Sequence, residues 1–97
     1  MKIQKIAYIQ AKVGLADALR QALIDLEKAT VLESGCVFFS FYQSLSDMES
    51  FVLIECFLNN EALELHMQLP HTVQFFQTDL VENIAVSEIS EKNLPIP

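Results

Sequence analysis

Two neighbouring stretches of the chain, residues 36–45 and 50–58, are apolar at nearly every position, and no other feature limits the fold as strongly. A β-strand with one side in water alternates apolar and polar residues. Here both sides of each predicted strand carry large apolar side chains: Val37, Phe39 and Phe41 against Cys36, Phe38 and Tyr42, then Val52, Ile54 and Cys56 against Phe51, Leu53 and Phe57. Helices of the same chain can cover only one side of such a sheet. The other side therefore requires a second sheet, a cavity or both, and a two-fold homodimer with its sheets face to face provides both.

The length of the chain permits one domain. It has 97 residues, and a typical domain has ~100–150. We expect the domain to span residues 1–92 and a tail to span residues 93–97. Hydrophobic residues make up 52% of the chain, which excludes a disordered protein. Because so short a chain buries a limited fraction of its surface, self-association would add burial.

The charge of the chain excludes several classes of partner. Its net charge is −7, and Arg20 is the only arginine. Nucleic acid and anionic membranes bind clustered Lys and Arg, so neither is an expected partner. No apolar run approaches the ~20 residues of a membrane span, and the N-terminus lacks the apolar core of a signal peptide. We therefore expect a cytoplasmic protein whose two cysteines, Cys36 and Cys56, are buried free thiols.

The remaining pattern completes an α+β domain. The short polar link at residues 46–49 makes the two apolar strands an antiparallel hairpin. Apolar spacing and helix-breaking residues predict the other elements. These are a strand over 3–11, a helix over 15–32, a short helix over 61–67, a helix from Pro70 to about Leu80 and a strand over 81–89. The order is the ferredoxin-like βαββαβ arrangement with an antiparallel sheet.

A set of short motifs follows these elements in a fixed order. Residues 51–57 end with Glu55-Cys56-Phe57, a glutamate followed two positions later by an aromatic residue. Residues 60–71 contain a predicted helix with an Ala-Leu pair, one histidine before a proline and another after it. Gly14 before the long helix, residues 33–36 after it and residues 42–44 belong to the same pattern. Together they resemble the antibiotic biosynthesis monooxygenase family over nearly the whole chain.

The resemblance implies a dimeric α/β barrel with a pocket inside each protomer. Several family members oxidise quinols or polycyclic aromatic phenols with O2, without metal or flavin. The resemblance therefore implies a cofactor-independent monooxygenase acting on a quinol-like or polycyclic phenolic compound. One alternative is a dimer that binds a small hydrophobic ligand without turnover, which the absence of tryptophan and the scarcity of arginine favour. Another is a protein that binds or degrades haem.

Three residues are the candidates for catalysis. His66 follows Ala62 by one helical turn and so points with the apolar side of its helix, where it could act as a base or an orienter for a phenolic hydroxyl. The alternative is a core histidine satisfied by one hydrogen bond. Glu55 and Tyr42 are expected to support His66. If the Glu55 side of its strand is covered, the carboxylate needs a partner such as His66, a tyrosine or a backbone donor.

Six further residues are predicted to line the pocket or bind the substrate, although each also has a purely structural interpretation. Aromatic residues are commonly core or interface residues, asparagine before a helix is a cap, and a histidine at a helix start can be partly exposed. The six are Tyr8, Phe38, Phe57, Asn60, His71 and Phe75.

The histidines also raise the question of a metal. With Glu55, His66 and His71 could form the 2-His-1-carboxylate set of a non-haem iron site. Two histidines five residues apart, with no obvious third ligand, do not by themselves indicate a metal. The chain also lacks a Gly-rich phosphate loop and clustered arginine. We therefore expect neither a metal nor an organic cofactor.

Overall fold

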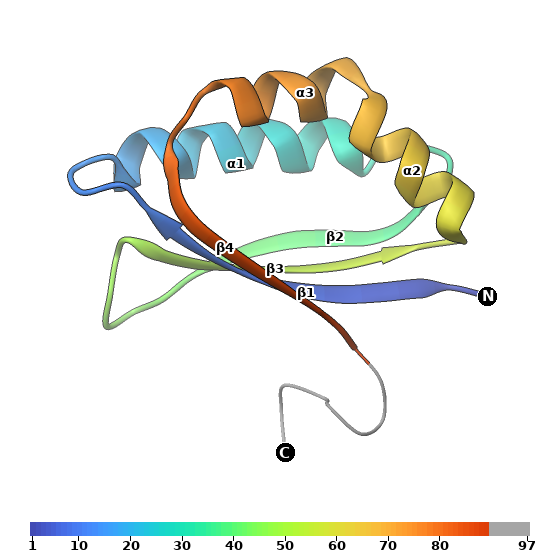
Figure 1. Cartoon of the computed structure of the whole chain (residues 1–97), viewed down its shortest axis with the longest axis horizontal. Helices are drawn as coiled ribbons and strands as arrows, with labels where there is room; N and C mark the ends of the chain where they lie inside the picture. Colours follow the sequence, from blue (N-terminus) through green and yellow to red (C-terminus); the bar gives the residue numbers. More distant parts are fainter. Residues whose placement is uncertain (90–97) are drawn as a thin grey trace.

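The computed structural model describes residues 1–89, which form one antiparallel sheet covered on one side by helices (Figure 1). The strand order in the sheet is β2-β3-β1-β4. The elements in chain order are β1 (Ile3–Ala11), α1 (Ala16–Thr30), β2 (Cys36–Gln43), β3 (Ser50–Phe57), α2 (Asn60–Gln68), α3 (Pro70–Gln77) and β4 (Val81–Glu88). This confirms the predicted ferredoxin-like arrangement. The predicted tail, residues 93–97, lies outside the described residues.

Three elements end two or three residues earlier than predicted. Helix α1 stops at Thr30 rather than residue 32, because the N–H groups of Leu32 and Glu33 donate to carbonyls three residues back, those of Ala29 and Thr30, and so leave the α-helical pattern. Strand β2 stops at Gln43, because Ser44 Oγ accepts hydrogen bonds from the turn N–H groups of Ser46 and Asp47. Helix α3 stops at Gln77, and the chain then passes through Asp79 in the left-handed region, at φ 55°.

Helix α1 binds the sheet through the apolar stripe that its spacing predicted. Leu19, Leu23, Leu26 and Thr30 are buried. The three leucines join a single core with strand residues such as Phe57, which is fully buried. Glu27, on the same helix, accepts a hydrogen bond at Oε1 from the Phe41 N–H, at 2.7 Å. The carboxylate thus satisfies a donor on edge strand β2 and fastens α1 over that edge.

A β-bulge changes which side of the sheet one residue faces. The β2–β3 register shifts between Cys36 and Phe38, so Val37 is the extra residue. Cys36 is therefore opposite Phe57, on the helix side, whereas strict alternation had placed it with Phe38 and Tyr42. Cys36 and Cys56 are both free and half-buried, not fully buried as expected.

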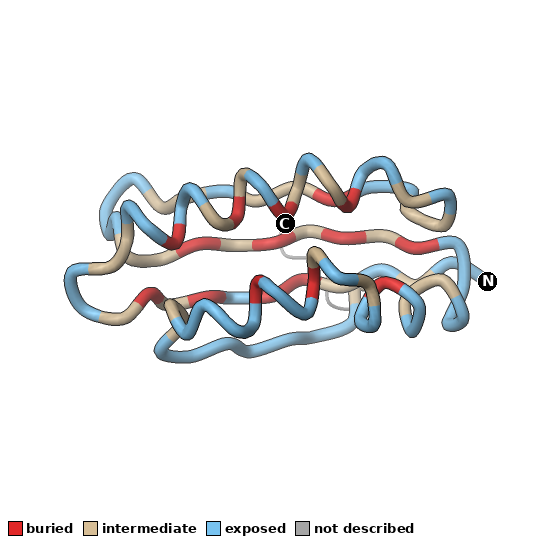
Figure 2. The backbone as a smooth tube through the Cα atoms, turned by 90° about the horizontal axis from the view of Figure 1, so that it is seen from above, coloured by how far each residue is buried: buried red, intermediate tan, exposed pale blue. Residues whose placement is uncertain are grey.

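The helices leave two apolar surfaces of the sheet uncovered. On the side away from the helices, Tyr8, Phe38 and Tyr42 are each about half exposed. At the edge, β4 is exposed along nearly its whole length, as the tube in Figure 2 shows, including Ile84 and Val86. The prediction that one chain cannot cover both sides of its sheet is confirmed.

No helix within residues 1–89 has the length and apolar character needed to cross a bilayer. The cytoplasmic location stays a prediction.

The loop before β2 passes so close to α2 that Gly35 has no room for a side chain. A Cβ at this position would lie 2.5 Å from Cβ of Ala62. We expect Gly35→Ala to destabilise the protein by ~1–3 kcal/mol through overpacking, which for a domain of this size lowers Tm by ~4–8 °C per kcal/mol. Thermal unfolding followed by circular dichroism measures this.

The control for Gly35→Ala is a double-mutant cycle with Ala62→Gly, which removes the opposing Cβ. Added to Ala62→Gly, the Gly35→Ala change should cost clearly less than it does alone. Equal costs in both backgrounds would show that the close contact with Ala62 is not the cause.

Candidate active site

The helices and the sheet enclose a cavity of about 310 Å³. Its floor is the helix side of the sheet, with Ala7, Leu53 and Phe41 in one cross-strand row. Its roof and wall come from the helices. The helix residues that line it are Leu26, Leu63, His66, Met67, Thr72, Phe75 and Phe76. The lining is mainly apolar and partly aromatic, as in sites for small organic ligands.

Three polar side chains from three segments meet at His66, which lines the cavity. Glu33 lies in the loop between α1 and β2, His66 in α2 and His71 at the start of α3. Oε2 of Glu33 lies 2.8 Å from Nδ1 of His66 and 2.6 Å from Nε2 of His71. Only a tenth of the Glu33 side chain is exposed. One largely buried carboxylate oxygen therefore orients both imidazoles.

This arrangement determines which nitrogen of His66 is available for chemistry. An imidazole that donates from Nδ1 to a carboxylate keeps its lone pair on Nε2. Within residues 1–89, Nε2 of His66 has no hydrogen-bond partner. Among these residues, Thr30 Oγ1 is the one fully enclosed polar side-chain atom without a partner. Nε2 of His66 therefore keeps some exposed surface, in a side chain that lines the cavity.

Aromatic rings fix the plane of the His66 imidazole. The ring centroid of Phe57 lies 4.9 Å from that of His66, and the centroid of Phe39 lies 5.4 Å away. His66 is 4% exposed. A histidine whose orientation is set by a carboxylate and by packed rings is a pre-organised proton acceptor, because little rotation remains to be lost when a substrate binds.

Glu55 and Lys5 are the charged residues on the floor of the cavity, opposite each other on β3 and β1. No hydrogen bond or ion pair holds the Glu55 carboxylate within residues 1–89, and the partner expected for it, His66, bonds Glu33 instead. Burial raises the pKa of Glu55 above its ordinary value, and the charge of Lys5 opposes this rise. Glu55 is thus the carboxyl group of the cavity best placed to carry a proton.

The structure brings some predicted site residues together and separates others. His66, Glu55 and Phe75 line the cavity, and Phe57 lies behind His66. His71 is bound to Glu33 and faces a neighbouring surface hollow instead. The predicted residues that do not line the cavity are Tyr42, Tyr8 and Phe38, on the opposite side of the sheet, and Asn60, exposed at the start of α2.

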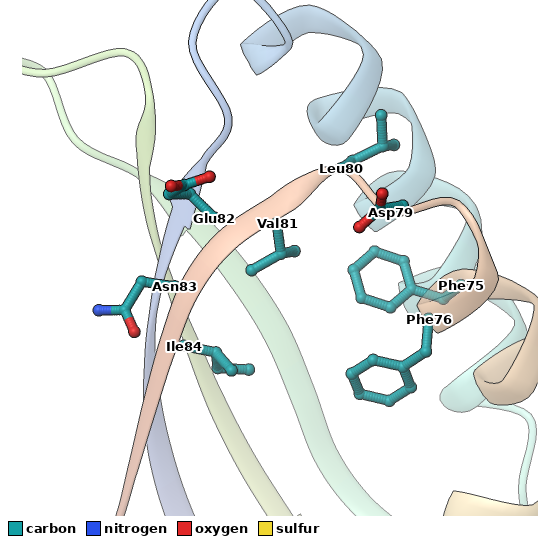
Figure 3. Close-up of a pocket in the computed structure, with 8 residues that line it drawn as sticks. All are labelled: Phe75, Phe76, Asp79, Leu80, Val81, Glu82, Asn83 and Ile84. Atoms are coloured by element: carbon teal, nitrogen blue, oxygen red, sulfur yellow. The ribbon is translucent and has the colours of Figure 1, made fainter.

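A second hollow, of about 350 Å³, adjoins the cavity where α3 passes into β4 (Figure 3). The rings of Phe75 and Phe76 face Val81 and Ile84, whereas Asn83 points to the other side of the strand. Phe75, Phe76 and Ile84 line both spaces. The two rings therefore stand between the cavity and this opening.

Cys36 contributes no reactive thiolate near the site. Burial, followed by the nearby Glu33 carboxylate, raises the pKa of the Cys36 thiol. A raised pKa keeps the sulfur protonated and weakly nucleophilic.

Two site residues were missed from the sequence. Glu33 is 33 residues from His66 along the chain, and no spacing rule links a loop residue to a helix so distant. Lys5 could have been found, because it has the same strand parity as Ala7 and Ile9 and therefore points to the same side of the sheet.

Residues 3–78 match the family model described as antibiotic biosynthesis monooxygenase. The match covers most of the chain and every element from β1 to α3. The chain belongs to this family. The resemblance drawn from its motifs is confirmed.

This antibiotic biosynthesis monooxygenase family protein is also similar to individual proteins in sequence and in structure. The uncharacterized protein sll1783 of Synechocystis sp. is 33% identical over 60 residues, which are 62% of this chain and 39% of that protein. The chain thus spans well under half the length of that relative. The crystal structure of PA3566 from Pseudomonas aeruginosa superimposes with a TM-score of 0.86 at 29% identity, covering 91% of each chain. Protein SO0527 from Shewanella oneidensis gives 0.84 at 26% identity, covering 91% of this chain and 88% of that one.

Glu55 gives a test of the cavity's electrostatics. Its raised folded-state pKa means that ionising Glu55 opposes folding, so stability is full below the unfolded pKa and is lost as pH rises through the folded one. We expect Glu55→Gln, which stays neutral, to raise Tm relative to the parent protein at pH 7 and to change it little near pH 4. Thermal melts across this range measure the difference.

The matched control for Glu55→Gln is Glu82→Gln, an exposed carboxylate on β4. It should leave the pH dependence of Tm unchanged. A Glu55→Gln protein that loses stability at pH 7 would show that the ionised carboxylate is favourable in the fold.

Proposed function

We propose that this protein is a cofactor-independent monooxygenase that oxidises a quinol-like or polycyclic phenolic compound with O2. The observation that carries the proposal is His66, held by Glu33 through Nδ1 with Nε2 unpaired, at the wall of an apolar, aromatic cavity. Membership of the antibiotic biosynthesis monooxygenase family supports the reaction class.

The first step is removal of the phenolic proton by Nε2 of His66. Accepting this proton converts His66 to an imidazolium. The Glu33 carboxylate, 2.8 Å from Nδ1, stabilises its positive charge. The substrate becomes an electron-rich anion delocalised onto carbon. The apolar walls exclude water, which would otherwise solvate this anion and lower its reactivity toward oxygen.

Oxygen then serves as the only oxidant. The anion transfers one electron to O2, and the resulting radical and superoxide combine to form a carbon–oxygen bond. The peroxide regains the proton held by His66. Where the attacked carbon is a CH2 group in the keto tautomer of the substrate, as in an anthrone, loss of water from the hydroperoxide leaves a carbonyl. That CH2 group and O2 then yield a C=O group and H2O with no other electron source.

Glu55 and Lys5 complete the proposed site from the floor. A carboxyl group whose pKa is raised by burial can hold a proton near neutral pH and donate it to a developing oxyanion. The ammonium of Lys5 would favour the same negative charge. Phe75 and Phe76, between the cavity and the hollow of Figure 3, are the proposed entrance for a flat aromatic substrate.

Oxygen uptake with a panel of quinols and anthrones, on chelator-treated protein, tests this function. Turnover should persist without metal, and His66→Ala should lower it by ~10²–10⁴-fold, the usual contribution of a positioned base. Glu64→Gln, an exposed change on the same helix, should leave turnover unaltered. Tm is recorded for each variant, because an orphaned Glu33 could cost ~1–3 kcal/mol of stability.

Two outcomes would redirect the assignment. If His66→Ala lowers Tm but not turnover per folded molecule, His66 is not the base. If no substrate consumes oxygen while aromatic compounds raise Tm by binding, the protein is a small-molecule binding protein, which the mainly apolar lining of the cavity also supports.

A homodimer is part of the proposal. Tyr8, Phe38 and Tyr42 are half exposed on the side of the sheet away from the helices, and β4 offers an exposed edge strand with Ile84 and Val86. Large apolar side chains in these positions favour association. A second copy packed against this side would bring Tyr42 and Tyr8 to the interface.

Sedimentation equilibrium tests the dimer. We expect a dimer at micromolar concentration, and Tyr8→Glu combined with Tyr42→Glu should shift it toward monomer by burying like charges. The control is Leu65→Glu, an exposed apolar residue on α2 far from that side, which should keep the dimer. A stable, folded monomer in the parent protein would contradict the proposal.

A further inference from the structure

We propose that Glu33, His66 and His71 also form a binding site for one divalent metal ion of the zinc type. Each contributes one ligand atom, namely Oε2, Nδ1 and Nε2, and these atoms lie within 4.8 Å of one another. They come from three separate segments, the loop before β2, α2 and the start of α3. This site differs from the expected triad, in which Glu55 would have supplied the carboxylate.

The three ligand atoms must rearrange to accept the ion. Zinc bonds of ~2.0–2.1 Å in a tetrahedral site hold neighbouring ligand atoms about 3.3 Å apart. The contacts from Glu33 Oε2 to His66 and His71 are 2.8 Å and 2.6 Å, so they must lengthen by roughly 0.5–0.7 Å. The two histidine nitrogens lie within 4.8 Å of each other, so they must approach by up to about 1.5 Å. His71 and the Glu33 loop can supply this movement, since the more tightly packed His66 is the fixed member.

The ligand types and their exposure favour the same ion. Two imidazoles and one carboxylate, with a fourth position open to water, suit zinc, cobalt or nickel rather than magnesium or calcium. The His71 side chain is 26% exposed, while those of His66 and Glu33 are 5% and 10% exposed. An ion can therefore enter beside His71, and the net charge of −7 favours its approach.

Metal binding and the proposed base role of His66 exclude each other, a consequence that rests on the proposed function. A metal on Nδ1 displaces the proton of that nitrogen, and the neutral imidazole then carries its proton on Nε2. Nε2 faces the cavity and would lose the lone pair needed to accept the phenolic proton. The metal would thus inhibit turnover.

Binding is tested on the full chain after chelator treatment. We expect ZnCl2 to bind saturably at one ion per chain by titration calorimetry, and CoCl2 to give the intense visible bands of a low-coordinate site. Glu33→Gln and His71→Ala should each weaken zinc binding at least ~10–100-fold, the usual effect of disturbing a metal's ligand environment. Glu64→Gln, an exposed acidic change, should leave the affinity unaltered.

The outcomes separate the metal site from the proposed function. The metal-site proposal is overturned if zinc does not bind saturably. It is also overturned if neither His71→Ala nor Glu33→Gln weakens binding in variants that circular dichroism shows to be folded. If zinc binds as expected but oxygen uptake is unchanged at saturation, the metal site stands and His66 is not the base. If zinc does not bind while His66→Ala abolishes turnover, the metal site fails and the proposed function stands.

Discussion

One carboxylate oxygen of Glu33, bonded at 2.8 Å to His66 and at 2.6 Å to His71, connects three segments beside the cavity that His66 lines. The bonds join the loop after α1 to α2 and to the start of α3. Because charge-assisted hydrogen bonds are strong and directional, they determine both the position of the helices and the tautomer of His66. The proposed base and the proposed metal site depend on this same contact. The tight approach of Gly35 to Ala62, two residues further along the loop, holds it in place.

The cavity exists because the helices cover the sheet unevenly. Helix α1 is fastened over β2 by its apolar stripe and by the bond from Phe41 N–H to Glu27. The β4 edge has no such cover, and Ile84 and Val86 line the cavity while remaining partly exposed. This space lets Lys5 and Glu55 occupy the helix side of the sheet without being packed against apolar atoms on every side. Burial nevertheless raises the pKa of Glu55. The ionised carboxylate therefore destabilises the fold, while the protonated form is available for the proposed proton transfer.

The side of the sheet that no helix covers also relates the fold to the proposed dimer. A ferredoxin-like sheet of this composition has apolar side chains on its second side, where Tyr8 and Tyr42 lie on either side of Val52 across three strands. A single chain cannot bury them, and a second copy can. The cavity and the proposed dimer surface therefore lie on opposite sides of one sheet, and alternation along each strand assigns residues to one or the other.

The elements and the main apolar side of each were predictable from local pattern, because a helix repeats every 3.6 residues and a strand every two. Leu19, Leu23 and Leu26 lie where that spacing places them, and Asn59 caps α2 by accepting from the Ala62 N–H. The inward direction of His66 followed from the same rule. The bulge at Val37 did not, because one extra residue reverses the alternation of what precedes it and leaves no mark in the composition.

The sequence by itself determined the fold class, the family and the inward position of His66. Only the tertiary structure decided that Glu33, and not Glu55, is the partner of His66. It also decided that His71 shares this carboxylate and that Tyr42 lies on the far side of the sheet. The physical reason is the separation along the chain over which each effect acts. Periodicity describes which way a side chain points within its own element, whereas a hydrogen bond between residues 33 and 66 depends on how a loop and two helices settle on a common core.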